Sequence, residues 1–251
     1  PEGLGIWRLG EYARALGYGQ ELGIELPGEA TGLIPDPNWK RLSQGENWAT
    51  GDTYIAAIGQ GYVLSTPLQV LVSVATIAND GKLMKPTLVK EVLDSEGNVI
   101  RPFQPVQLRD ITSDPVIHVY DENFITTGEM KVVEPWVIEK AQEAMRLVVS
   151  GGTAEKVFAN IDAQIPTAGK TGTAEYCDNV AQSKDLCKPG RWPAHAWYVG
   201  YAPYNDPEIV VVAFVYNGTE GAILAAPVVR KVMEAYFAFK EFDAAAGAAQ
   251  P

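Results

Sequence analysis

Apolar residues recur at helical spacing in two stretches of the first eighty residues. Over 6–16 they favour an amphipathic helix that stops at Gly17. The segment Thr66-Pro67-Leu68-Gln69 has the pattern of a capping box, with proline at the first helical position. We therefore expect a second helix that runs to about Asn79. Its apolar residues wrap most of the circumference, which is typical of a helix buried in a core.

The rest of the chain predicts both strands and helices. Short apolar runs alternate with turns over 83–133, which indicates a hairpin and an excursion. Helices are expected over 135–150, from a cap at Thr153 to Phe158, and over 226–239. Strands are expected over 168–174, 194–201 and 209–216. Consecutive antiparallel strands between helices predict an α+β domain, with an antiparallel sheet and flanking helices.

Composition narrows the classes of partner. The chain has 251 residues with 47% apolar content, which is enough for a sizeable core. Its formal charge of −11 repels polyphosphates, so nucleic acid is excluded as a partner. No stretch approaches the roughly 20 apolar residues that span a bilayer, and the N-terminus lacks a signal-peptide pattern. The chain as given is therefore expected to be soluble.

The segment Lys170-Thr171-Gly172-Thr173 has residue types that suggest chemistry. A phosphate-binding loop would need glycine where Gln164 stands, and Pro166 removes an N–H that such a loop would use. A solvated lysine beside a turn of small residues is the plain alternative. The third interpretation is the Lys-Thr-Gly element of penicillin-recognising serine enzymes. On a strand edge, that element offers a cation, two hydroxyls and a glycine beside which a peptide can pair.

The neighbouring motifs decide among these interpretations, because they follow one another along almost the whole chain. They are Leu16-Gly17-Tyr18-Gly19, Leu26-Pro27-Gly28-Glu29, Gly32-Leu33-Ile34-Pro35, Ile58-Gly59-Gln60-Gly61-Tyr62, Gly151-Gly152-Thr153-Ala154, Gly169-Lys170-Thr171-Gly172-Thr173-Ala174-Glu175 and Ala194-His195-Ala196-Trp197-Tyr198-Val199-Gly200-Tyr201. In their order and spacing the chain resembles the class B penicillin-binding proteins, particularly the elongation-type group called penicillin-binding protein 2.

The resemblance implies a fold and a reaction. The fold would be that of penicillin-binding transpeptidases and serine β-lactamases, incomplete at its N-terminus, over residues 1–240, with a flexible tail at 241–251. The reaction would be serine acyl transfer on D-Ala-D-Ala stem peptides, which cross-links peptidoglycan in the cell wall and supports cell shape. β-Lactams would acylate the same serine. Neither a cofactor nor a metal is expected.

Site residues and partners are also implied by the resemblance. Lys170 would act in the serine–lysine proton-transfer network, and the N–H of Thr173 would bind the oxyanion. Thr171, Gly172, Thr173 and Ala174 would bind substrate. A membrane glycosyltransferase of the elongation machinery would be a partner. The full-length protein would be extracytoplasmic, in the periplasm or at the cell surface, and anchored to the inner or cytoplasmic membrane.

Two further motifs of that family are absent from the chain. None of its seven serines is followed by lysine three places later, as Ser-x-x-Lys requires, or by asparagine two places later, as Ser-x-Asn requires. We interpret this as truncation of a longer transpeptidase, so this chain alone is expected to be inactive. The alternatives are a pseudoenzyme, a non-catalytic interaction module of the elongation complex, and a β-lactamase or β-lactam sensor of the same fold.

The loop after Lys170-Thr171-Gly172-Thr173 holds both cysteines of the chain, Cys177 and Cys187. A disulfide between them would close this loop; free thiols or a metal site with His195 are the alternatives, although the spacing is not a standard one for zinc. His195 itself is expected to pack rather than to catalyse. Tyr176 and Trp192 are candidates for contact with a stem peptide.

Overall fold

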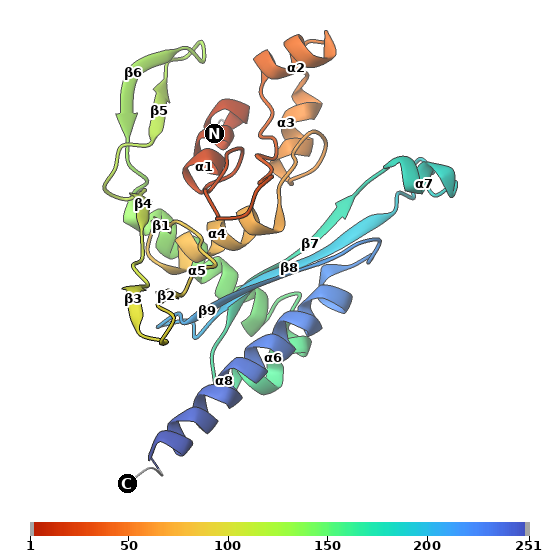
Figure 1. Cartoon of the computed structure of the whole chain (residues 1–251). Helices are drawn as coiled ribbons and strands as arrows, with labels where there is room; N and C mark the ends of the chain where they lie inside the picture. The colour runs from red at the N-terminus through yellow and green to blue at the C-terminus, as the bar shows by residue number, and fades with distance from the viewer. Residues whose placement is uncertain (1–2, 249–251) are drawn as a thin grey trace. The chain divides into compact units, whose positions relative to one another are not determined.

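The computed structural model describes residues 3–248. These residues divide into two compact units, and the boundary lies between Glu139 and Lys140. The first unit contains four helices and three antiparallel strand pairs (Figure 1). Its helices are α1 (Gly5–Ala15), α2 (Pro37–Gln44), α3 (Thr50–Ala57) and α4 (Pro67–Ala78). Its strands are β1 (Lys82–Met84), β2 (Glu91–Leu93), β3 (Val99–Pro102), β4 (Gln107–Asp110), β5 (Ile117–Tyr120) and β6 (Thr126–Lys131). Helix α5 (Pro135–Ser150) begins in this unit and ends in the next.

Helix α4 begins and ends as its sequence predicts. The hydroxyl of Thr66 accepts a hydrogen bond from the Gln69 N–H at 3.1 Å, and the Gln69 side chain accepts one from the Thr66 N–H at 3.1 Å. Asp80 and Gly81 follow the helix with positive φ angles of 53° and 95°, which end it. Val72 on α4 packs with other buried residues of this unit, so the prediction of a core helix is confirmed.

Helix α2 was not predicted, because its start lies in a stretch rich in glycine and proline. Asp36 is its N-cap and accepts a hydrogen bond from the Trp39 N–H at 2.8 Å, while Pro37 occupies the first helical position. Pro37 therefore opens a helix rather than interrupting one. Lys40 on α2 is buried and pairs with Asp52 of α3 at 2.8 Å.

The stretch 83–133, for which the sequence predicts a hairpin and an excursion, contains three antiparallel strand pairs: β1–β4, β2–β3 and β5–β6. Glu11 of α1 links the helix to the β5–β6 pair through hydrogen bonds. Its buried carboxylate accepts hydrogen bonds from Arg14, from His118 Nδ1 at 2.8 Å and from the Tyr120 hydroxyl at 2.8 Å. These three donors satisfy a charge that would otherwise be costly to bury.

The second unit is built on a three-stranded antiparallel sheet in the order β7–β8–β9 (Figure 1). The strands are β7 (Ala168–Glu175), β8 (Ala194–Ala202) and β9 (Ile209–Val215), as the sequence predicts to within a residue or two. The helices are α6 (Glu155–Asp162), α7 (Asn179–Ser183) and α8 (Ala226–Ala248), with a single π-helical turn, η1 (Gly221–Ala225), before α8. Tyr198 of β8, Phe158 of α6 and Met233 of α8 are fully buried together in the core of this unit.

Two helix boundaries differ from prediction. Thr153 is not a cap: Ala154 is the N-cap residue of α6, which continues past Phe158 to Asp162. Helix α8 does not end near Phe239 but runs through Ala248, because the alanine-rich stretch has high helix propensity. The predicted flexible tail therefore starts within a helix, and its last residues, 249–251, lie outside the described residues.

Candidate functional site

Strand β7 carries the Lys170-Thr171-Gly172-Thr173 segment at one edge of the sheet. Its register with β8 is continuous from Ala168, opposite Tyr201, to Glu175, opposite Ala194. Just beyond, the Tyr176 N–H donates to the Pro193 carbonyl at 2.9 Å. Because backbone groups alternate sides along an antiparallel strand, the N–H and C=O groups of odd-numbered residues on β7 are directed away from β8. These residues include Thr171 and Thr173.

Lys170 folds over this outer edge of the strand. Its exposed ammonium group donates a hydrogen bond to the Thr171 carbonyl at 2.7 Å. The alternation just described directs that carbonyl away from β8, so the cation lies on the side of β7 that faces away from β8. The structure thus brings together the charge, the hydroxyl-bearing residues and the strand edge that the sequence predicted for this segment.

Thr153 supports the segment from the adjacent turn. Its hydroxyl lies 3.0 Å from that of Thr171, within hydrogen-bond distance. The turn depends on Gly152, because a Cβ atom there would lie 2.9 Å from the Leu147 carbonyl oxygen. The sequence shows the Gly-Gly-Thr motif but not its contact with β7, since Thr153 was interpreted as a helix cap.

Backbone segments approach each other closely at the centre of β7. A Cβ atom on Gly172 would lie 3.1 Å from the Cβ of Trp197 on β8. A Cβ atom on Gly221, in η1, would lie 2.1 Å from the Trp197 carbonyl oxygen and 2.6 Å from that of Gly172. Glycine at 221 therefore allows η1 to lie directly against the strand that carries the candidate site.

An ion pair holds the start of β7. Arg146 of α5 binds both carboxylate oxygens of Asp162 at 2.8 Å and also donates to the Thr167 carbonyl at 2.9 Å. Asp162 in turn accepts the Thr167 N–H at 2.7 Å. Thr167, directly before β7, is fully buried, so this network satisfies its backbone groups and positions the strand. Sequence reasoning missed it, because partners 16 residues apart show no local pattern.

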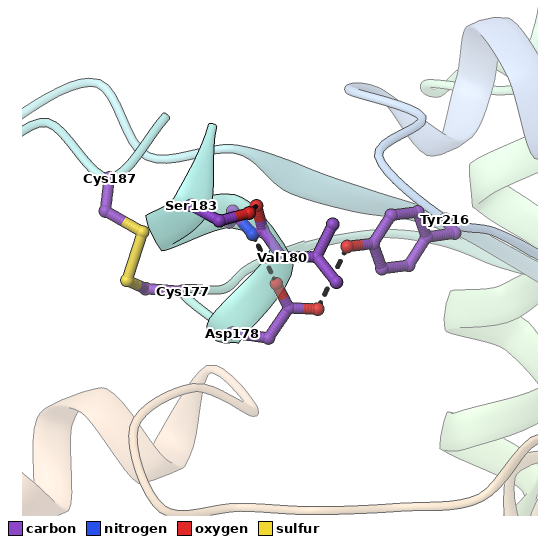
Figure 2. The surroundings of a disulfide bond; sticks show 7 residues. Cys177, Asp178, Val180, Ser183, Cys187 and Tyr216 are labelled. Atoms are coloured by element: carbon purple, nitrogen blue, oxygen red, sulfur yellow. Dashed lines mark hydrogen bonds between the residues drawn. A yellow bond between two sulfur atoms is a disulfide. The ribbon is translucent and has the colours of Figure 1, made fainter. Parts of the chain in front are cut away.

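A disulfide closes the loop that follows β7. Cys177 and Cys187 are bonded, with their Cα atoms 5.7 Å apart (Figure 2). Asp178 caps α7 by accepting the Ala181 N–H at 2.7 Å. Its other oxygen accepts the Tyr216 hydroxyl at 2.9 Å (Figure 2). The Ala181 bond and then the Tyr216 bond lower the pKa of Asp178. The loop is therefore tied both to itself and to the residue after β9.

Aromatic side chains surround His195 at this end of the sheet. The Tyr176 ring stacks on the imidazole at 3.8 Å between centroids, and Tyr216 lies 5.0 Å from it. The Asn217 N–H donates to His195 Nδ1 at 3.2 Å, which uses that nitrogen as an acceptor. Burial lowers the pKa of His195, although the charge of Asp178 opposes the shift. These contacts match the packing role predicted for His195.

Within residues 3–248, no group of three or more His, Cys, Asp and Glu side chains is arranged to hold a metal ion. In the same part of the chain, no helix has the length and apolar character needed to cross a bilayer.

Comparison with known proteins gives consistent matches. Residues 2–234 match the family described as penicillin binding protein transpeptidase domain. The peptidoglycan D,D-transpeptidase MrdA of Haemophilus influenzae is 35% identical over 243 residues, which cover 93% of this chain and 33% of that protein. The chain thus spans about a third of the length of this relative.

Solved structures are similar over the same extent. Pseudomonas aeruginosa PBP2, in complex with WCK 5153, has 34% sequence identity and a TM-score of 0.69, over 93% of this chain and 43% of that chain. A second solved chain has 38% sequence identity and a TM-score of 0.68, over 92% of this chain and 33% of that chain. Its structure is described as "Structural coordination of polymerization and crosslinking by a peptidoglycan synthase complex".

Proposed function

The chain belongs to the penicillin-binding protein transpeptidase domains of the class B, penicillin-binding protein 2 type, and we propose that it is part of a peptidoglycan D,D-transpeptidase. Its mixed helical and antiparallel fold is the fold of that family. The whole protein's activity is our proposal, because the chain covers a third of the MrdA relative. We assign residues 1–240 to the C-terminal portion of this domain.

The observation that carries the proposal is the position of Lys170 at the outer edge of β7, beside backbone groups directed away from β8. A stem peptide ending in D-Ala-D-Ala would pair along this edge as an added strand. Thr171 and Thr173 would bind its terminal carboxylate through their hydroxyls, and Gly172 with Ala174 would leave room for its backbone.

The proposed reaction is a two-step acyl transfer through a serine supplied from outside these 251 residues. The serine oxygen forms a bond to the carbonyl carbon of the penultimate D-alanine, and the N–H of Thr173 stabilises the oxyanion. The peptide bond then breaks and the terminal D-alanine leaves with a proton on its nitrogen. An amine of a second stem peptide attacks the ester, forms the cross-link and releases the serine. Lys170 would assist these proton transfers.

Three further features belong to the proposal. β-Lactams, whose strained amide resembles the scissile bond, would acylate the same serine. The similarity to a chain of a peptidoglycan synthase complex supports a membrane glycosyltransferase as partner. A cell-wall substrate implies an extracytoplasmic location, with the membrane anchor in a part of the protein outside these residues. Tyr176, which lies directly after β7, would contact the stem peptide beyond the carboxylate-binding residues.

The proposal is tested by labelling with a fluorescent penicillin. We expect this chain alone to remain unlabelled, while a longer form of the protein that carries Ser-x-x-Lys forms a covalent adduct stable to denaturation. A folded longer form that does not label would contradict the transpeptidase assignment. Rapid hydrolytic turnover of the penicillin would instead indicate a β-lactamase.

A further inference from the structure

The β-ribbon over residues 82–110 exposes apolar side chains along its length. It contains the pairs β1–β4 and β2–β3, and no residue of β2 or β3 is buried. Its exposed large apolar residues are Leu88, Val89, Val92, Leu93, Val99, Ile100, Phe103, Val106 and Leu108. Isolated two-stranded ribbons are marginal in water, and contiguous exposed apolar surface marks interaction sites. The ribbon is therefore a candidate docking surface.

The two strands of the ribbon separate between the β1–β4 and β2–β3 ladders, where the sequence contains prolines. The Lys85 N–H bonds to the Val106 carbonyl at 2.8 Å, and regular pairing resumes where Glu91 lies opposite Pro102. In between, 86–90 on one side faces the shorter segment 103–105 on the other. Proline at 86, 102 and 105 removes backbone donors that a ladder would need. The strands separate and leave a groove of about 400 Å³.

The groove combines apolar walls with a net positive charge. Val89, Val92, Phe103 and Val106 supply apolar surface. Its charged residues are the cations Lys85, Lys90 and Arg101 and the carboxylates Glu25 and Glu91. The excess of cations is notable in a chain whose formal charge is −11.

Both carboxylates of the groove already have partners. Glu25 accepts the Thr87 hydroxyl at 2.8 Å and the Leu88 N–H at 3.0 Å, and Glu91 lies 4.0 Å from Lys90. Across residues 3–248, no carboxylate lies within ion-pair distance of Arg101. Its guanidinium, with five donors in a planar fork, is therefore available for a carboxylate from another molecule.

We propose that this groove binds an extended segment of a partner protein in which acidic residues alternate with apolar ones. In an extended segment successive side chains point to opposite faces, so one face can lie on Val89 and Phe103 while the other presents carboxylates to Arg101 and Lys85. The salt bridges would be exposed to solvent and therefore screened by ions, so binding weakens as salt rises. This role is independent of the proposed acyl transfer.

The test uses two fluorescein-labelled hexapeptides, one alternating valine with glutamate and one alternating valine with lysine. Fluorescence anisotropy with the 251-residue chain should show binding of the glutamate peptide, and its affinity should fall as salt is raised. Arg101→Glu should weaken that binding about tenfold and favour the lysine peptide. Arg41→Glu makes the same charge change on exposed α2 and should leave the preference unaltered.

Val89→Asp provides an independent variant: because it removes apolar contact and adds a negative charge, it should weaken binding of the glutamate peptide while circular dichroism stays unchanged. The proposal is overturned if the wild-type chain binds both peptides equally or neither. It is also overturned if Arg101→Glu and Arg41→Glu behave alike. Dimerisation of the wild-type chain that Val89→Asp abolishes, measured by sedimentation velocity, would assign the groove to a second copy and likewise contradict it.

Discussion

At the residue scale, the most constrained positions of the site are glycines whose missing Cβ atoms let backbones touch. Gly221 has a carbonyl oxygen where a Cβ would stand, whereas Gly151, in the turn after α5, has nothing within 4 Å of that position. Substitution of the two glycines should therefore reduce stability by different amounts, although the residue replaced is the same. A comparison between them isolates packing from the general effect of replacing glycine.

Gly221→Ala should destabilise the protein by about 3 kcal/mol, because the added methyl group collides with backbone atoms that cannot rotate away. Gly151→Ala should change stability by less than about 0.5 kcal/mol. Urea denaturation of both variants measures the difference. Equal unfolding free energies for the two would mean that η1 does not lie against β7 as described.

Glu11 gives a second prediction at this scale. Burial raises its pKa, but hydrogen bonds from His118, Tyr120 and Arg14 outweigh burial and bring the pKa from 4.5 to about 2. The ionised carboxylate therefore contributes stability that is fully present above pH 4.5 and is lost as the pH falls to about 2. The contribution is up to about 3 kcal/mol.

Glu11→Gln cannot titrate, so we expect it to be less stable than the wild type at pH 7 and to lose less stability between pH 4.5 and 2. Unfolding free energies from urea denaturation across that range test this. A variant whose stability falls with pH as steeply as that of the wild type would show that Glu11 is not the group responsible.

At the element scale, strand β7 is held at both ends, by the Arg146–Asp162 pair before it and by the disulfide loop after it. The ion pair and the disulfide both join residues that strand pairing does not connect. The ion pair is largely shielded from solvent, with side-chain exposures of 24% and 16%, which distinguishes it from the exposed Lys140–Glu143 pair at 63% and 54%.

Asp162→Asn should cost about 2 to 3 kcal/mol, because Arg146 would keep its charge in a shielded position without a carboxylate. Glu143→Gln, which removes the exposed pair, should cost less than about 0.5 kcal/mol. Thermal unfolding of the two variants provides the comparison. Similar effects from both would argue against a special role for the pair before β7.

Reduction of the Cys177–Cys187 bond should release a loop of about ten residues and cost roughly 2 to 3 kcal/mol. Amide hydrogen exchange should accelerate in α7 while β8 and β9 remain protected. The Cys177→Ser and Cys187→Ser double variant should behave like the reduced protein. Unchanged exchange in α7 after reduction would show that other contacts, such as Asp178 with Tyr216, suffice to order the loop.

At the scale of the whole molecule, local patterns predicted most of the fold. The capping box before α4, the turn glycines and the apolar runs of β8 and β9 act through neighbours in sequence, so their elements were found. Helix α2 was missed because Pro37 is compatible with both a loop and a helix start. The end of α8 was misplaced because alanine favours a helix without giving it a buried face.

The candidate site was likewise predicted only in part from the sequence. The Lys170-Thr171-Gly172-Thr173 segment was recognised from its residues and from the ordered motifs around it. Its surroundings were not, because Thr153, Arg146 and Gly221 approach β7 only through tertiary structure. Residues that are far apart in the sequence but in contact leave no spacing pattern in a single sequence. The contacts that support β7 are therefore visible only in the folded structure.

The central claim, that β7 is the substrate side of an acyl-transfer site, is tested most directly by acylation kinetics. In a longer form of the protein that carries Ser-x-x-Lys, Lys170→Ala should slow acylation by fluorescent penicillin about a hundredfold, because the proton-transfer network loses its cation. The Lys188→Ala variant, which changes an exposed lysine directly after Cys187, should acylate at the wild-type rate. Acylation of Lys170→Ala at the rate of the wild type would contradict the claim.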